Sequence, residues 1–352
     1  MRISFINTRS NFSLFVMIFI TYHGFIHGQL DNTQRMTKSG TTAAQFLKIG
    51  IDARATAMGN AFTAMDGDIS SMFWNAAGLA NLKRSETMFV KNDWLSGTDF
   101  QYIGFAIPLR DLGVIGFGIT SLNVPDDKVR TVTDPEGTGE YWGAQDLSAN
   151  ISFARKLTDK FNIGGNIKLI QQRIWHSNAS TFALDLGALF ITPFKGVRLG
   201  VSLSNYGGEL RMTGRDQKLS VDPDPVNQGN VEFVNSLYET DAFPLPLMFR
   251  VGLSGELLRT DVLRLSYGVD AFHPNDNSEA VNTGLELAVG EMFFLRGGHA
   301  NLFRENAEEG FTLGGGFHYR SRATKTTLRI DYSYVDFGLL KYVNRVSIGI
   351  IL

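Results

Sequence analysis

The feature that most constrains the fold is an alternation of apolar and polar residues that recurs along most of the chain. Residues 161–169 read FNIGGNIKL, with apolar side chains at odd positions apart from a glycine at 165. Residues 328–334 read LRIDYSY, with the same period. A period of two places one apolar and one polar face on an extended strand.

About fourteen segments follow this pattern. They lie near 86–95, 99–109, 113–124, 145–157, 161–175, 179–191, 196–206, 244–258, 262–273, 278–289, 291–303, 310–322, 325–336 and 341–352. Strands of soluble proteins are commonly ~5–6 residues long, whereas a tilted strand crosses a bilayer in ~9–11 residues. The lengths therefore favour membrane-crossing strands.

The connections between these segments alternate in character. Several are tight turns, as at 110–112, 158–160 and 259–261, and two of the others are long, at about 125–144 and 207–243. Short turns at one end and longer loops at the other are typical of outer-membrane barrels. We therefore expect an all-β fold, a 14-stranded antiparallel transmembrane β-barrel over residues 85–352. An even strand number predicts that both termini lie at the short-turn end, in the periplasm.

The polar face of the segments is consistent with a hydrated lumen. A soluble sandwich would bury its apolar faces, whereas a membrane barrel turns them toward lipid. The inward polar set is mixed in sign: Asn166, Lys168, Asp185, Arg198, Arg250, Arg264, Asp270, Glu286, Arg296, Arg329 and Asp331. We favour packing of the lumen wall over substrate contact for each of them. Aromatic residues near strand ends suit the interfacial girdles: Tyr102, Trp142, Trp175, Tyr206, Tyr319 and Tyr342.

The N-terminus has the organisation of a signal peptide over residues 1–28. Arg2 and Arg9 precede the short apolar run FSLFVMIFI at 12–20, and cleavage after Gly28 is expected. An uncleaved anchor is the alternative, which the shortness of the run disfavours. No later stretch has the ~18 consecutive apolar residues of a membrane-spanning helix. We expect export to the outer membrane of a Gram-negative-type envelope.

Composition argues against several classes of function. The net charge of −2 disfavours a nucleic-acid partner, which needs a clustered basic excess. The chain has no cysteine, which removes thiolate metal sites and a cysteine nucleophile. The six histidines lack the spacing of a zinc site, and no Gly-x-Ser-x-Gly elbow occurs. We expect no enzyme activity, no catalytic residues, no cofactor and no metal.

A compact segment precedes the strands, at 29–84. Residues 53–64 have the small side chains of a packed helix, and Asp68 is a candidate N-cap for a second short helix through Trp74. Gly78 suits a sharp turn into the first strand. We expect this segment to form a hatch inside the barrel mouth, with Trp74 as its anchor.

The stretch IDARATAMGNAFTAMDGDISSMFWNAAGLA at 51–80 resembles the N-terminal signature of the PorV/PorQ family, which is related to fatty-acid-transporter-like barrels. The matching hatch residues include Met58, Gly59, Asp66, Asp68, Trp74, Asn75, Gly78 and Leu79. The sequence departs from the pattern at Asn60 and Ala76, where the family has glycine and proline. The stretch LTDKFNIGGNIKLIQQRIW at 157–175 also resembles the central hairpin of this family.

The resemblance implies a hatched barrel of fourteen strands that works in type IX protein secretion. Its partners would be outer-membrane lipid, a translocon barrel and the C-terminal domains of cargo. The alternative is a passive transporter of hydrophobic solutes such as long-chain fatty acids, which the charged lumen disfavours. The long 207–243 segment is the candidate partner loop, through Phe233, Leu237, Tyr238 and Phe243, which can anchor an interface.

Overall fold

The computed structural model describes residues 38–224, 226, 233–305 and 307–352. The expected signal peptide, its cleavage site and residues 29–37 of the hatch lie outside them. The helical elements are short: η2 (Gln45–Lys48), α2 (Ala53–Ala57), α3 (Ser71–Trp74), η3 (Ala76–Asn81), η4 (Leu95–Gly97), η5 (Arg110–Leu112), η6 (Arg215–Gln217) and η7 (Gly338–Leu340). Within the described ranges, no helix has the length and apolarity needed to cross a membrane.

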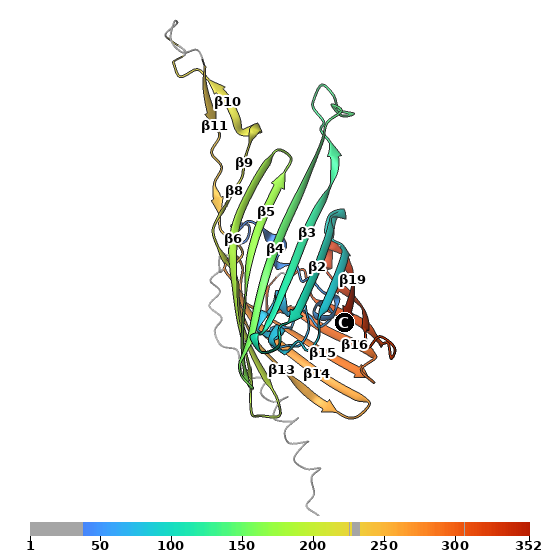
Figure 1. Cartoon of the computed structure of the whole chain (residues 1–352). Coiled ribbons are helices and arrows are strands. Elements are labelled where there is room, and N and C mark those ends of the chain that lie inside the picture. The colour runs from blue at the N-terminus through green and yellow to red at the C-terminus, as the bar shows by residue number, and fades with distance from the viewer. Residues whose placement is uncertain (1–37, 225, 227–232, 306) are drawn as a thin grey trace, which may run out of the picture. The chain divides into compact units, whose positions relative to one another are not determined.

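Fourteen antiparallel strands close into a barrel (Figure 1). They are β1 (Glu86–Asp93), β2 (Asp99–Pro108), β3 (Val114–Lys128), β4 (Tyr141–Thr158), β5 (Phe161–Ile174), β6 (Ser177–Ile191), β7 (Arg198–Gly207), β13 (Met248–Arg259), β14 (Leu263–Pro274), β15 (Ala280–Val289), β16 (Phe293–Leu302), β17 (Phe311–Arg320), β18 (Thr327–Asp336) and β19 (Tyr342–Ile351). Each strand pairs with its neighbours along the chain, and β1 pairs with β19 to close the ring. The predicted fold class is confirmed.

The described strands overlap each of the fourteen predicted segments, and the main differences lie at the long connections. β3 and β4 extend beyond their predicted ends, because their ladder continues to Lys128 and Tyr141. The 207–243 segment holds five short strands between β7 and β13: β8 (Leu210–Arg211), β9 (Thr213–Gly214), β10 (Lys218–Val221), β11 (Val234–Leu237) and β12 (Ala242–Phe243). β10 and β11 pair as a hairpin that projects beyond the barrel (Figure 1).

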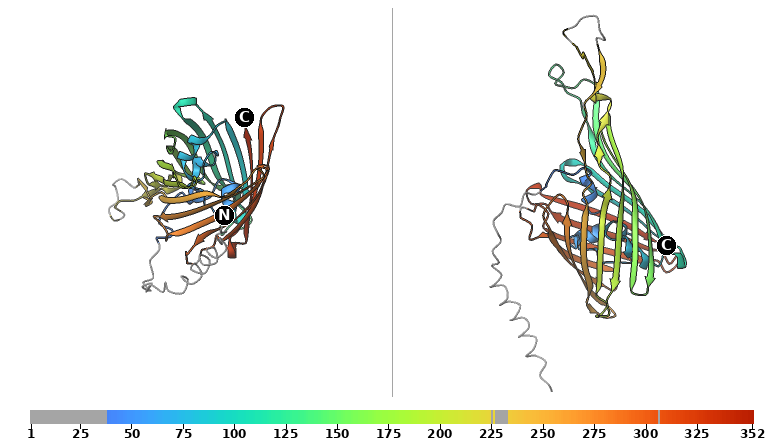
Figure 2. Two further views of the ribbon diagram at one scale, coloured as in Figure 1. Left: turned by 90° about the horizontal axis from the view of Figure 1, so that it is seen from below. Right: turned by 90° about the vertical axis from the view of Figure 1, so that its left-hand side faces the viewer.

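The described N-terminal residues 38–85, called the plug below, fold inside the ring of strands (Figure 2). They run the length of the lumen. Ala43 N–H donates to the carbonyl of Pro244 (3.0 Å), at the end with the long connections. Asp66 lies at the short-turn end, beside Arg198 at the start of β7. β1 then begins at the same edge where β19 ends, because Glu86 pairs with Ile351.

The plug and the wall share an apolar core. One cluster joins Ile69, Met72 and Leu79 of the plug to Met88 and Phe100 on β1 and β2. A second cluster joins Phe46 and Leu47 to Ile170 on β5 and Leu210 on β8. Because burial of apolar surface is the main driving force of folding, these clusters hold the plug in the lumen.

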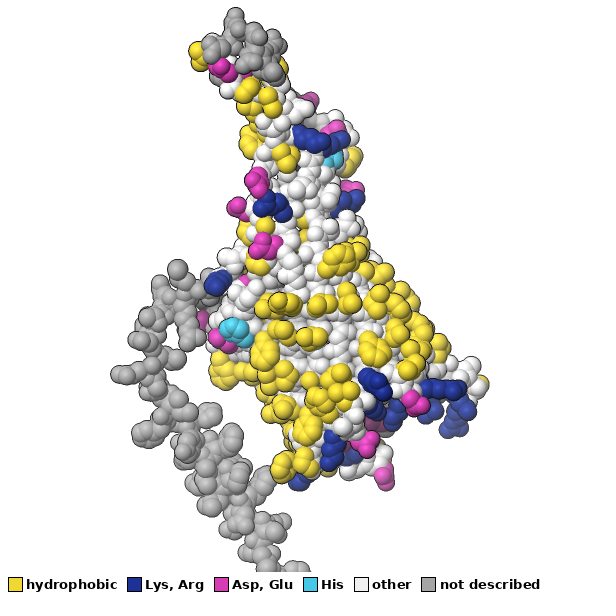
Figure 3. Space-filling model, turned by 60° about the vertical axis from the view of Figure 1, so that its left-hand side comes forward, with side chains coloured by type: hydrophobic (Ala, Val, Ile, Leu, Met, Phe, Trp, Pro, Cys, Tyr) yellow, Lys and Arg dark blue, Asp and Glu magenta, His cyan; other side chains and the backbone are white. Residues whose placement is uncertain are grey.

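The two faces of the strands have the predicted polarity. On β5, Ile167 and Leu169 are 60% and 46% exposed on the outer wall, whereas Asn166 and Lys168 are 4% and 6% exposed in the lumen. Hydrophobic side chains cover the barrel on the face in Figure 3, and charged side chains gather at one rim and along the projecting arm. A wall of this kind suits contact with lipid.

The predicted aromatic girdle needs one correction. Tyr102 is buried in the core between β2 and the plug, because its position on β2 faces the lumen. Trp142, Trp175 and the other three predicted aromatics are exposed. They remain available for an interface with lipid headgroups.

Candidate functional site: a plug held inside the barrel

The first turn of the plug is organised by one buried carboxylate. Asp52 caps α2, and its Oδ2 accepts from Ala55 N–H at 2.8 Å. Its Oδ1 accepts from Trp74 Nε1 at 2.9 Å, which ties α2 to α3. Burial and the nearby charge of Asp68 raise the pKa of Asp52.

The predicted helix over 53–64 is wrong in its extent, since α2 ends at Ala57. Gly59 and Asn60 have φ values of +62° and +65°, a left-handed conformation that stops a right-handed helix. At Gly59 the chain also touches β16, where an added Cβ would lie 2.7 Å from the His299 backbone. Gly59 N–H donates to Thr312 Oγ1 on β17 at 2.9 Å. Met58 is fully buried beside Phe62 and Trp74.

The cap prediction for Asp68 is confirmed only in part. Ser70 occupies the N-cap position of α3, without a side-chain hydrogen bond to the helix, but Asp68 Oδ1 accepts from Ser70 N–H at 2.9 Å and so caps the turn that leads into the helix. Asp68 Oδ2 accepts from Arg54 Nη1 (3.1 Å) and from Arg329 Nη1 of β18 (2.9 Å). Burial alone would raise the pKa of Asp68, but the guanidinium groups of Arg329 and Arg54 hold it well below its ordinary value of 3.8.

Asp66 joins the plug to the wall at the short-turn end. One of its carboxylate oxygens lies 3.3 Å from Arg198 Nε, and the other accepts from Asn81 Nδ2. Asp66 therefore forms an ion pair with the wall at β7. Both aspartates of the predicted hatch motif bind arginines that project from the barrel.

Four residues of the predicted motif are buried at the end of α3 and in η3: Trp74, Asn75, Gly78 and Leu79. Trp74 is buried edge-on against Phe73, with ring centroids 4.9 Å apart. Asn75 caps η3 by accepting from Ala77 N–H, and its amide donates to the carbonyl of Ala188 on β6 (3.0 Å). Gly78 is required by close packing rather than by a turn, because a Cβ there would lie 2.7 Å from Ser71 Oγ.

Sequence reasoning missed the charge network that joins the plug to the wall. Arg54 of α2 donates to both carboxylate oxygens of Glu286 on β15, at 2.8 and 3.0 Å. Glu286 also accepts from Arg296 (2.8 Å), its cross-strand partner on β16, and Arg296 donates to Asp331 (2.6 Å). The opposite charges on adjacent strands are a signal in the sequence, but their link to Arg54 is visible only in the fold.

A belt of wall glycines lies against the plug. Gly164 and Gly268 lie where the plug backbone contacts the strands, and an added Cβ would lie 2.5 Å from backbone atoms of Ala76 and Ala61, respectively. At Gly314 an added Cβ would lie 2.5 Å from the Ala57 side chain. The alternation in the sequence places these glycines on the polar face of their strands, which is the face that lines the lumen. Their lack of a side chain lets the plug backbone approach the wall directly.

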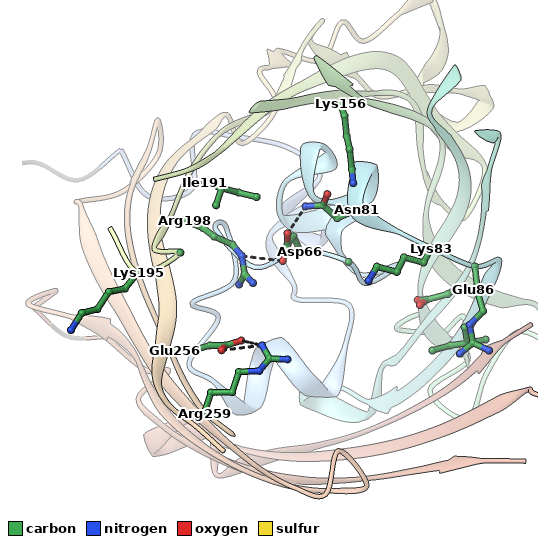
Figure 4. A pocket seen from close by; sticks show the side chains of 14 residues that line it. Asp66, Asn81, Lys83, Glu86, Lys156, Ile191, Lys195, Arg198, Glu256 and Arg259 are labelled. Carbon is green, nitrogen blue, oxygen red and sulfur yellow. Dashed lines mark hydrogen bonds and ion pairs between the residues drawn. The ribbon is translucent and has the colours of Figure 1, made fainter. Parts of the chain in front are cut away.

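Two cavities lie at opposite ends of the plug. The larger, of about 650 Å³, opens at the short-turn end and is lined by Asp66, Asn81 and Lys83 of the plug and by wall residues that include Lys156 and Lys195 (Figure 4). The smaller, of about 180 Å³, lies at the long-connection end beside Asn60 and Trp74. Within the described ranges, no group of three or more histidine and acidic side chains is arranged to hold a metal ion.

The candidate partner loop lies outside the barrel. Phe233, Leu237 and Tyr238 lie on or beside the β10–β11 hairpin, and Phe243 lies in β12, which pairs with β8. All four side chains are between 44% and 67% exposed. The structure places Phe233, Leu237 and Tyr238 on one projecting arm, whereas Phe243 lies nearer the barrel, where its strand partner Leu210 packs against the plug. The role of these residues as a partner surface stays a prediction.

Comparisons with known proteins show which fold the chain has. It is similar to CymD, a monoaromatic hydrocarbon channel, with a TM-score of 0.54 and 11% identity over 86% of this chain and 96% of that one. It is also similar to the toluene transporters TodX of Pseudomonas putida and TbuX of Ralstonia pickettii, each with a TM-score of 0.51 over 86% of this chain and 97% of theirs. Their identities to this chain are 11% and 13%.

The fold is therefore the closed fourteen-strand antiparallel barrel of these solved structures. An uncharacterised protein family (UPF0164) matches residues 26–180, and no curated protein matches the chain. The three solved structures are a channel and two transporters, and none of them is named as a secretion component. The PorV/PorQ resemblance stays a prediction.

Proposed function

We propose that this chain is a plugged outer-membrane barrel that passes small hydrophobic solutes across the membrane. One observation carries the proposal: the N-terminal plug is folded inside a closed fourteen-strand wall of the kind found in hydrocarbon transporters. A fold by itself does not establish a function. The site adds a cavity at each end of the lumen, with the plug contributing to the lining of both.

The proposal reverses the order of the two functions given by the sequence. The alternative of passive transport becomes the main proposal, because the similar structures are named for hydrocarbon passage. Transport then requires the plug to shift, since its ion pairs and close glycine contacts join it to the wall around the lumen.

We infer the placement in the envelope from the same features. Lipid is the partner of the exposed apolar wall, as in other outer-membrane barrels. The short-turn end, where β1 begins and β19 ends, faces the periplasm in this proposal. The long connections and the β10–β11 arm then face the outside.

Type IX secretion remains the second candidate, and the arm is the observation that favours it. Phe233, Leu237 and Tyr238 are exposed beyond the barrel rim. Exposed aromatic side chains are common anchors of protein interfaces. A translocon barrel or the C-terminal domain of a cargo protein would be the partner.

The test compares solute uptake with cargo display in a strain that lacks the gene. We expect labelled toluene and oleate to enter the deletion strain several-fold more slowly, and the intact gene to restore uptake. A variant trimmed at 215–240 should also restore it, because the arm lies outside the lumen. Outer-membrane abundance of each variant is the control.

The opposite pattern would contradict the proposal. If uptake is normal and proteins with type IX C-terminal domains accumulate in the periplasm, secretion is the function. In that case the trimmed variant should fail as the deletion does. The two functions therefore predict different results for the same pair of strains.

A further inference from the structure

The smaller cavity, called the upper pocket below, has the composition of a binding site. It lies between the plug and the wall, at the end with the long connections, and three plug residues line it. Four of the lining residues are apolar or aromatic: Trp74, Met248, Phe272 and Pro274. The others are polar or charged: Lys48, Asn60, Arg250, Asn277, Asn282, Asn301, Arg304 and Glu309.

Arg250 is a buried cation without a direct counter-charge. Its side chain on β13 is 7% exposed and lies over the Trp74 ring, 5.6 Å from the centroid. It donates one side-chain hydrogen bond, from Nη1 to Ser204 Oγ at 3.2 Å. No salt bridge joins it to a carboxylate in the described part of the chain. A buried charge is costly when it is unpaired, so this arginine is suited to receive an anion.

Arg304 supplies a second cation with spare donor capacity. Its Nη1 and Nη2 donate to Asn301 Oδ1 (2.9 Å) and to the carbonyl of Ser278 (2.7 Å), and these bonds fix the guanidinium. The group lies 5.1 Å from the centroid of the Phe272 ring. Its Nε is buried and has no hydrogen-bond partner among the described residues.

The remaining charges of the pocket do not cancel these two arginines. Lys48 is paired with Asp276, at 2.8 Å. Glu309 accepts a hydrogen bond from Asn60 Nδ2 at 2.7 Å, and it is a single carboxylate against two arginines among the lining residues. The upper pocket is therefore electropositive.

We propose that the upper pocket binds a small organic carboxylate, with its carboxylate at Arg250 and Arg304 and its apolar body against Phe272, Met248 and Pro274. The volume of about 180 Å³ limits the size of the body. A dry cavity of ~150 Å³ accepts benzene, so a single ring fills this pocket. Arginine is suited to carboxylates because its planar donors can form paired hydrogen bonds.

This inference concerns binding, and only its role in uptake rests on the proposed function. The hydrocarbons in the names of the similar structures are uncharged, whereas this pocket favours a negatively charged ligand. Packing of the lumen wall is the competing explanation of Arg250, with Asp270 as a more distant counter-charge. Binding measurements distinguish the two explanations.

The experiment titrates benzoate into the purified full-length mature barrel in detergent, by calorimetry. Benzyl alcohol serves as the uncharged comparison and inorganic phosphate as the anion without an apolar body. We expect benzoate to bind at least tenfold more tightly than either. Arg250→Gln and Arg304→Gln should each weaken benzoate at least tenfold, and Arg304→Gln changes a connection rather than the wall. Arg198→Gln is the matched control, because Arg198 lines the other cavity.

Three results would overturn the proposal. The proposal is contradicted if benzoate does not bind, or if both arginine variants bind benzoate as tightly as the parent. It is also contradicted if phosphate binds with the same affinity as benzoate. Folding of each variant is checked by its mobility in gels before and after boiling. If the protein does not bind benzoate but toluene uptake is normal, only the binding proposal is contradicted. If it binds benzoate but takes up no solute, only the transport proposal is contradicted.

Discussion

At the scale of single residues, charge holds the plug in place. Asp68 lies between Arg54 of the plug and Arg329 of the wall, and Arg329 also binds Glu86 at the start of β1. The sequence places Asp68 in a hatch and Arg329 in the lumen. It does not predict their contact, because no local pattern relates residues that are 261 positions apart.

We predict that Asp68→Asn releases the plug while the barrel stays folded. Removing one partner of a buried ion pair typically costs ~3–5 kcal/mol, because Arg329 then keeps a partly unpaired charge. The measurement is protease cleavage within residues 38–85 in outer-membrane fragments, over a series of urea concentrations. Arg259→Gln is the control, since its pair with Glu256 is at the surface and such pairs are worth about 0–1 kcal/mol. Equal cleavage in the two variants would contradict the role of Asp68.

The same carboxylate predicts a dependence on pH. The pKa of Asp68 in the folded plug is below its ordinary value of 3.8, so its contribution to stability is fully present above that value. The contribution is lost as the pH falls through the lower, folded pKa. We expect the part of protease access that depends on Asp68, measured as the difference between the parent and Asp68→Asn, to change only in strongly acidic buffer and to be constant between pH 5 and pH 7. In Asp68→Asn the part of the acid response due to this group should disappear.

At the scale of elements, strands are better predicted than the helices of the plug. Alternation identifies each barrel strand, because burial on one face imposes a local period. α2 is shorter than its composition predicts, since Gly59 and Asn60 adopt left-handed conformations that contact with the wall stabilises. The short strands β8 to β12 have no strong alternation, so the sequence leaves them as a loop.

The glycine belt gives a prediction at this scale. Gly268→Leu should displace the plug, because an added Cβ on β14 would lie 2.5 Å from the carbonyl oxygen of Ala61. Overpacking of this kind typically costs 1–3 kcal/mol. Gly297→Leu is the matched control on β16, where the nearest atom lies at an ordinary 3.5 Å. We expect faster proteolysis of the plug in Gly268→Leu alone. Similar rates in both variants would show that the belt does not position the plug.

At the scale of the whole molecule, the barrel and the plug can be predicted from the sequence, whereas the contacts that hold the plug in the barrel cannot. Strand number and polarity are encoded locally, in alternation and turns. The ion pairs and the cavities depend on which strands face the plug, and that depends on closure of the ring. The proposed function is likewise a property of the closed barrel, since in that proposal the passage of solutes requires the plug to move.

The most direct test of this account locks the plug to the wall. Thr56 Oγ1 of α2 and Ser333 Oγ of β18 lie 2.9 Å apart, and the chain has no cysteine of its own. In the double variant Thr56→Cys/Ser333→Cys, an oxidant should form the cross-link in outer membranes, visible on a non-reducing gel. We predict that toluene uptake stops on oxidation and returns with a reductant, while Thr56→Cys alone is unaffected. Undiminished uptake through the cross-linked barrel would contradict the claim that the plug must move for solutes to pass.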